Sequence, residues 1–68
     1  MKNTIERLEE MIMREKDKLE RLYKRICETS PEEQDKLKRL NIQYDNLRNY
    51  IMGLDTALTY IKIEKGML

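Results

Sequence analysis

An unbroken repeat of apolar residues between Leu37 and Ile61 constrains this chain more than any other feature of its sequence. The repeat advances in alternating steps of three and four residues, which keeps every member on one stripe of an α-helix. Its members are Leu37, Leu40, Tyr44, Leu47, Ile51, Leu54, Leu58 and Ile61. Because exposing such a stripe to water is unfavourable, this helix must pack against another one, as the a and d positions of a coiled coil do.

A second stripe with the same spacing precedes the first one along the chain. Its members are Ile5, Leu8, Ile12, Glu15, Leu19, Leu22 and Ile26. Several acidic residues lie four positions before a basic one, as Asp17 does before Arg21, and such pairs stabilise a helix. We expect a first helix over about residues 3–28, capped by Asn3 or Thr4.

The segment between the two stripes predicts a sharp reversal of the chain. Ser30 is a favourable N-cap, Pro31 is tolerated at the first helical position, and Glu33 would complete a capping box. These signals predict a turn at residues 29–30 and a second helix over about residues 31–65, which Gly66 would end. The alternative is a break at Gly53 that starts a third helix.

The two helices together predict an all-α fold, an antiparallel two-helix hairpin with coiled-coil-like packing, as one domain of residues 1–68. The second helix is longer than the first, so residues beyond about Leu58 would have no facing partner. A chain of 68 residues usually needs oligomerisation or another stabilising link. We therefore expect a homo-oligomeric helical bundle, a dimer or larger. The expected interface residues are Tyr50, Leu54, Leu58, Tyr60, Ile61, Met67 and Leu68.

Glu15 interrupts the first stripe at a position where leucine would be usual. Antiparallel pairing places it opposite Tyr44, the hydroxyl-bearing member of the second stripe. One interpretation is a polar layer that fixes the register of the two helices. The other is an acidic group in a ligand pocket, joined by Arg48.

Basic residues follow one flank of the first helix. They are Arg7, Arg14, Lys18, Arg21 and Arg25. The flank is either an ordinary solvated surface or a contact for an anionic partner, with Tyr23 or Tyr50 stacking on a base. A host protein or an anionic small molecule would suit it. The net charge of +1 argues neither for nor against nucleic acid, but the mixed signs make extended duplex the least suitable partner.

The residue types and motifs of the sequence argue against catalysis. The sequence contains no histidine and no glycine-rich phosphate loop, and its one cysteine, Cys27, has no histidine partner. We expect no enzymatic activity, no catalytic residues, no metal site and no cofactor. Because no apolar run has the length of a membrane span or a signal segment, we expect no membrane association and a cytoplasmic location.

The segment from Ile5 to Ile61 resembles short helical-hairpin proteins of bacteriophages and prophages, including crAss-like phages. The resemblance lies in the start Pro31-Glu32-Glu33 and in Gln43, Leu47, Tyr50 and Leu54 at the spacing Gln-x3-Leu-x2-Tyr-x3-Leu. It implies an accessory protein in the host cytoplasm that binds a host component. The sharper version of this expectation is an anionic nucleotide signal used in defence. The alternative function is a structural or regulatory oligomerisation module.

A weaker resemblance is to the small aspartyl-phosphate phosphatases of sporulating bacteria, which are also helical hairpins. Their Ser-Gln-Glu-Leu-Asp signature would fall on residues 41–45, where only Asp45 matches. This resemblance implies a degenerate phosphatase, which is the minor alternative.

Overall fold

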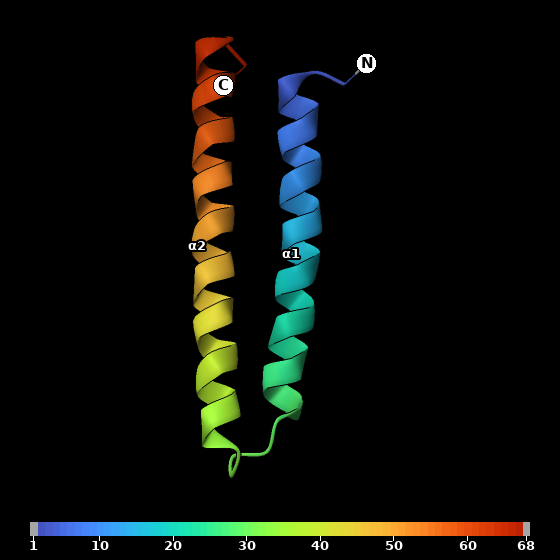
Figure 1. Cartoon of the computed structure of the whole chain (residues 1–68). Coiled ribbons are helices and arrows are strands. Elements are labelled where there is room, and N and C mark those ends of the chain that lie inside the picture. The colour runs from blue at the N-terminus through green and yellow to red at the C-terminus, as the bar shows by residue number, and fades with distance from the viewer. Residues whose placement is uncertain (1, 68) are drawn as a thin grey trace.

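The computed structural model describes residues 2–67 as two antiparallel helices, α1 (Thr4–Glu28) and α2 (Gln34–Glu64) (Figure 1). The helices lie side by side along the long dimension of a molecule that measures 51 × 20 × 15 Å. Residues 29–33 connect them at one end. The all-helical hairpin expected from the two apolar stripes is therefore confirmed for the part of the chain that the structure describes.

Capping hydrogen bonds satisfy part of the free backbone groups at both ends of α1. Asn3 is the N-cap, and its side-chain oxygen accepts a hydrogen bond of 2.8 Å from the backbone N–H of Glu6. At the other end, the backbone N–H of Thr29 donates to the carbonyl of Ile26, and its hydroxyl donates to the carbonyl of Arg25. These local hydrogen bonds explain why the helix begins and ends where it does.

The turn differs from the sequence prediction, because α2 begins at Gln34 and not at Pro31. The backbone N–H of Glu33 donates to the carbonyl of Ser30 at 3.0 Å, so residues 30–33 form a β-turn with Pro31 second. Glu33 precedes the helix without a side-chain cap, and the predicted capping box is wrong. The physical reason is that the fixed φ of proline suits the second position of a β-turn as well as the start of a helix.

The second helix is continuous across Gly53, so the alternative of a third helix is wrong. Its C-terminus has the hydrogen bonds of a Schellman motif. The N–H of Met67 donates to the carbonyl of Lys62 at 2.8 Å, and the N–H of Gly66 donates to that of Ile63 at 3.0 Å. Gly66 has φ of +70°, a conformation that glycine adopts without strain. It ends α2 as the sequence predicts.

The core is a single layer of apolar side chains between the two helices. Its buried members are Ile5, Ile12, Leu22, Leu40, Ile51 and Leu58. Half-buried residues of the same stripes, Leu8, Leu19, Leu47, Leu54 and Ile61, pack around them. Every buried side chain in residues 2–67 keeps at least 5% of its surface exposed. Two helices alone thus enclose a thin core.

The overhang of α2 beyond α1 is shorter than the sequence predicts. Ile61 packs against the hairpin core and Leu58 is buried in it, so α1 covers α2 further than predicted. Figure 1 shows the start of α1 close to the end of α2. The reason is the longer turn, which shifts the facing residues along α2. Tyr60 and Met67 remain exposed, and Leu68 lies outside the described residues.

Candidate functional site

The basic flank of α1 borders two adjoining hollows between the helices. The first, of about 330 Å³, is lined by Lys18, Arg21, Leu22, Arg25 and Leu47. The second, of about 270 Å³ and nearer the turn, is lined by Arg25, Lys36, Arg39, Leu40 and Gln43. We call the second one the basic hollow. Arg25 borders both, so α1 and α2 together supply the cations of one side of the hairpin.

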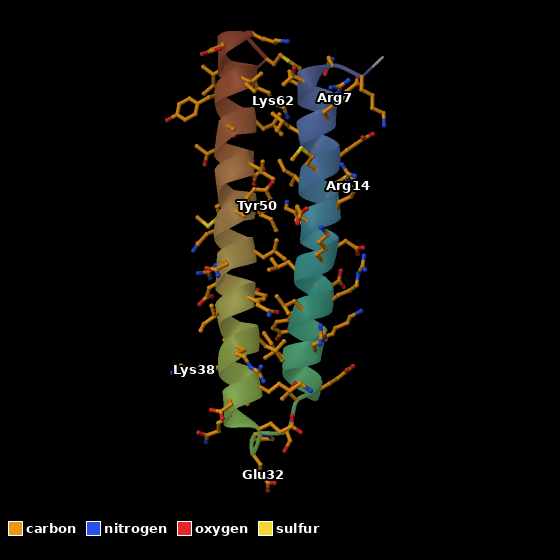
Figure 2. The ribbon with its side chains drawn as sticks, in the orientation of Figure 1. Arg7, Arg14, Glu32, Lys38, Tyr50 and Lys62 are labelled. Atoms are coloured by element: carbon orange, nitrogen blue, oxygen red, sulfur yellow. The ribbon has the colours of Figure 1, made fainter. Side chains whose placement is uncertain are left out.

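Ion pairing differs along this side. Arg21 pairs with Asp17, and Lys18 pairs with Glu15 at 3.2 Å. Among residues 2–67, no carboxylate lies within 4.0 Å of the guanidinium of Arg25 or of Arg39. Arg7 and Arg14 likewise have no carboxylate within this distance in the described part of the chain, so the unpaired cations of the flank lie at both ends of α1. The remaining predicted members, Arg7 and Arg14, lie further along α1 towards its start (Figure 2).

Tyr23 lies on the opposite flank of α1 from Arg25. Its ring packs against that of Tyr44, with centroids 6.3 Å apart and planes inclined by 50°. The pair lines a separate hollow of about 340 Å³ with Lys16, Leu19 and Glu20. The thiol of Cys27, one turn along α1, raises the pKa of the Tyr23 phenol. Tyr23 therefore does not line either hollow of the basic flank.

The predicted polar layer of Glu15 and Tyr44 is wrong. Glu15 pairs with Lys18 in its own helix, and Tyr44 packs on Tyr23. Arg48 pairs with Asp45 at 4.0 Å, also within one helix, so it does not join Glu15. The five-residue turn explains the difference, because it moves the residues of α2 relative to those of α1.

Glu15→Leu should stabilise the protein. The Glu15 side chain keeps only 19% of its surface exposed, and its ion pair with Lys18 is of the kind that contributes little. An apolar side chain in the stripe should add about 1 kcal/mol to the free energy of unfolding. Urea denaturation followed by circular dichroism measures this free energy of unfolding. Glu9→Leu, at an exposed position of α1, should change stability by less than about 0.5 kcal/mol. A loss of stability in Glu15→Leu would contradict this account.

A second apolar surface lies on the side of α2 that faces away from α1. Figure 2 shows Lys38, at the turn end of this side, directed away from α1. Helical spacing from Lys38 continues the side through the residues that we call the outer face. The outer face consists of Ile42, Asp45, Asn49, Met52, Gly53, Thr56, Tyr60 and Ile63. Its four large apolar side chains are each at least 52% exposed.

The outer face carries the charge of Asp45 near its turn end and is uncharged from Asn49 to Ile63. Residues 49–61 contain only one charged side chain, that of Asp55, although charged residues make up 40% of the chain. A shallow hollow of about 430 Å³ lies beside Tyr60 and Ile63, and it is also lined by Asp55, Thr56 and Thr59. Sequence reasoning named Tyr60 and Met67 but did not assign Ile42 or Met52 to an interface. The signal that reveals them is a second stripe opposite the first on the same helix.

The other predicted interface residues lie elsewhere. Leu54, Leu58 and Ile61 pack in the core between α1 and α2, and are directed to the partner helix of the same chain. Tyr50 is 50% exposed and lies at the edge of the seam in Figure 2. Only part of the predicted set is therefore exposed in the hairpin.

Two chemical features are absent from the described residues. Residues 2–67 contain no group of three or more histidine, cysteine or acidic side chains arranged to hold a metal ion. Neither helix, within those residues, combines the length and apolar character that crossing a membrane requires.

Comparison with known proteins finds no matching family model, no matching curated protein and no matching solved structure.

Proposed function

We propose that this protein is a non-enzymatic interaction protein that assembles with copies of itself through the outer face of α2 and binds another component on its basic side. The observation that carries the proposal is the outer face itself. In the described residues, eight large apolar side chains are at least 50% exposed, and four of them, Ile42, Met52, Tyr60 and Ile63, lie on this face. An exposed apolar surface of this extent on a soluble hairpin is typical of a protein interface.

A second copy of this chain is the occupant that the outer face suits best. A two-fold axis would place the same surface of both copies in contact, which is how most homodimers form. The face extends over about 32 Å from Ile42 to Ile63, so the contact would follow most of α2. A Cβ added at Gly53 would meet nothing within 4 Å in the hairpin, which leaves room for a second backbone to approach there.

The small core gives a physical reason for assembly. A hairpin with a single layer of buried side chains gains only a few kcal/mol from folding. Covering Met52, Tyr60 and Ile63 in a dimer would add apolar burial at about 25 cal/mol per Å². We infer that folding and assembly support each other in this protein.

The basic side is the proposed contact for the other component. The apolar part of the outer face is centred on residues 49–63 of α2, whereas the basic hollow lies at the turn end. Self-assembly would therefore leave the cations accessible. The resemblance to phage hairpins suggests that the bound component belongs to a host cell and is sequestered, and the sharper form of this proposal is an anionic nucleotide signal. A structural oligomerisation module is the alternative, and such a module would assemble but bind no anion.

Light scattering on the purified protein tests the assembly. We expect a concentration-dependent mass that reaches at least twice the 8.3 kDa of one chain. A sharp monomer at high concentration would overturn the proposal. The basic side is tested separately, by the titration described below.

A further inference from the structure

We propose that the basic hollow beside the turn binds the phosphate group of a small anionic ligand, a phosphomonoester. Its cations come from both helices: Arg25 from α1, and Lys36 and Arg39 from α2. Gln43 adds an amide at the rim, and Leu40, which is 5% exposed, forms an apolar floor. This inference rests on the binding role proposed above and is independent of self-assembly, because one hairpin contains the whole site.

The fold brings these residues together through the turn. Arg25 lies in the last turn of α1, and Lys36 and Arg39 lie in the first turns of α2. The β-turn at residues 30–33 reverses the chain, so the two helix ends are neighbours (Figure 1). Arg39 and Gln43 are four residues apart and lie on the same side of α2. The site is therefore built on two helices, which a short turn of defined conformation connects.

The charges of the hollow favour a dianion. Three like charges around one space repel each other, and only Lys36 has a carboxylate partner, Glu33 at 3.7 Å. That ion pair is exposed on both sides and contributes little, so it leaves the ammonium able to contact a ligand. The guanidinium groups of Arg25 and Arg39 present paired N–H donors that match the oxygens of a phosphate. A bound phosphate would reduce the repulsion between the three cations.

The shape of the hollow favours a small phosphate ligand over a nucleic acid duplex. A space of about 270 Å³ has room for a phosphate group and a modest substituent. A duplex would need cations spaced along the whole flank, whereas Arg25, Lys36 and Arg39 lie together at the turn end. Tyr23, which is 56% exposed, lies in a different hollow, so no base would stack on it from this site. Recognition would therefore depend on the phosphate and little on the base.

A titration followed by two-dimensional NMR of the ¹⁵N-labelled full chain tests this inference. The probes are inorganic phosphate, adenosine monophosphate and adenosine, in a buffer that contains chloride as the only other anion. We expect phosphate and adenosine monophosphate to shift the signals of Arg25, Lys36, Arg39 and Gln43, with a Kd on the order of 1 mM. Adenosine should shift none of them.

Two double variants distinguish a specific phosphate site from nonspecific electrostatic attraction. Arg25→Gln with Arg39→Gln should weaken phosphate binding at least roughly ten-fold, because two charge-assisted hydrogen-bonding groups are lost. Lys24→Gln with Lys38→Gln removes the same charge from neighbouring positions and should change the Kd less than about two-fold. Circular dichroism checks that both variants keep their helices.

Three results would overturn the inference: no shift at these residues with about 10 mM phosphate, an equal loss of affinity in both double variants, or adenosine binding as tightly as its monophosphate. Light scattering on the same samples separates this outcome from a failure of the proposed assembly. Loss of phosphate binding in a protein of unchanged mass would count against the phosphate site alone.

Discussion

Met52→Glu should convert the assembled protein into monomers. Met52 lies on the outer face of α2 and is 60% exposed in the hairpin, so the substitution leaves the intramolecular core intact. In a two-fold dimer, however, it would bury one unpaired carboxylate from each copy. Removing such a charge from water costs several kcal/mol, so self-association should weaken at least about a hundred-fold. Light scattering and sedimentation equilibrium measure the change in mass and affinity.

The matched control is Met13→Glu. Met13 lies on α1 and is 71% exposed, so the same chemical change occurs on a helix that the proposed interface does not include. This variant should keep the mass of the unmodified protein. Circular dichroism should show the same helix content in both variants. If Met52→Glu stays assembled, or if Met13→Glu dissociates as readily, the outer face is not the interface.

Ile51→Ala should unfold most of the protein at low concentration, although residue 51 is the immediate neighbour of Met52. Ile51 is 6% exposed and packs in the central cluster with Ile12 and Leu58. Truncating a buried isoleucine to alanine removes apolar contacts and leaves a cavity, which costs about 2–4 kcal/mol. A hairpin of this size has only a few kcal/mol of stability to lose. Thermal and urea denaturation, followed by circular dichroism, measure the loss.

Ile42→Ala is the control for this core substitution. Ile42 belongs to the same helix but is 52% exposed on the outer face. At concentrations where the protein is monomeric, the free energy of unfolding should change by less than about 0.5 kcal/mol, and the higher helix propensity of alanine favours the variant. Equal losses in the two variants would show that the core does not lie between α1 and α2 as described.

The candidate site could be predicted from the sequence only in part. The cations of α1, Arg25 among them, share a flank because of the 3.6-residue period, which is visible in the sequence. The contribution of Lys36 and Arg39 could not be found in this way. Whether they approach Arg25 depends on the path of the turn, and Pro31 is compatible with both a β-turn and a helix start. The outer face is periodic and could have been recognised as a second stripe on α2.

The sequence by itself determined the two helices, their apolar stripes and most of their ends. Asn3 caps α1, and Gly66 ends α2 through φ of +70°, because these signals act within a few residues of the chain. Only the tertiary structure decided which residues face each other. The conformation of residues 29–33 sets the register between the helices, so Tyr44 meets Tyr23 and not Glu15. A contact between distant residues depends on the geometry of the turn, which local patterns leave open.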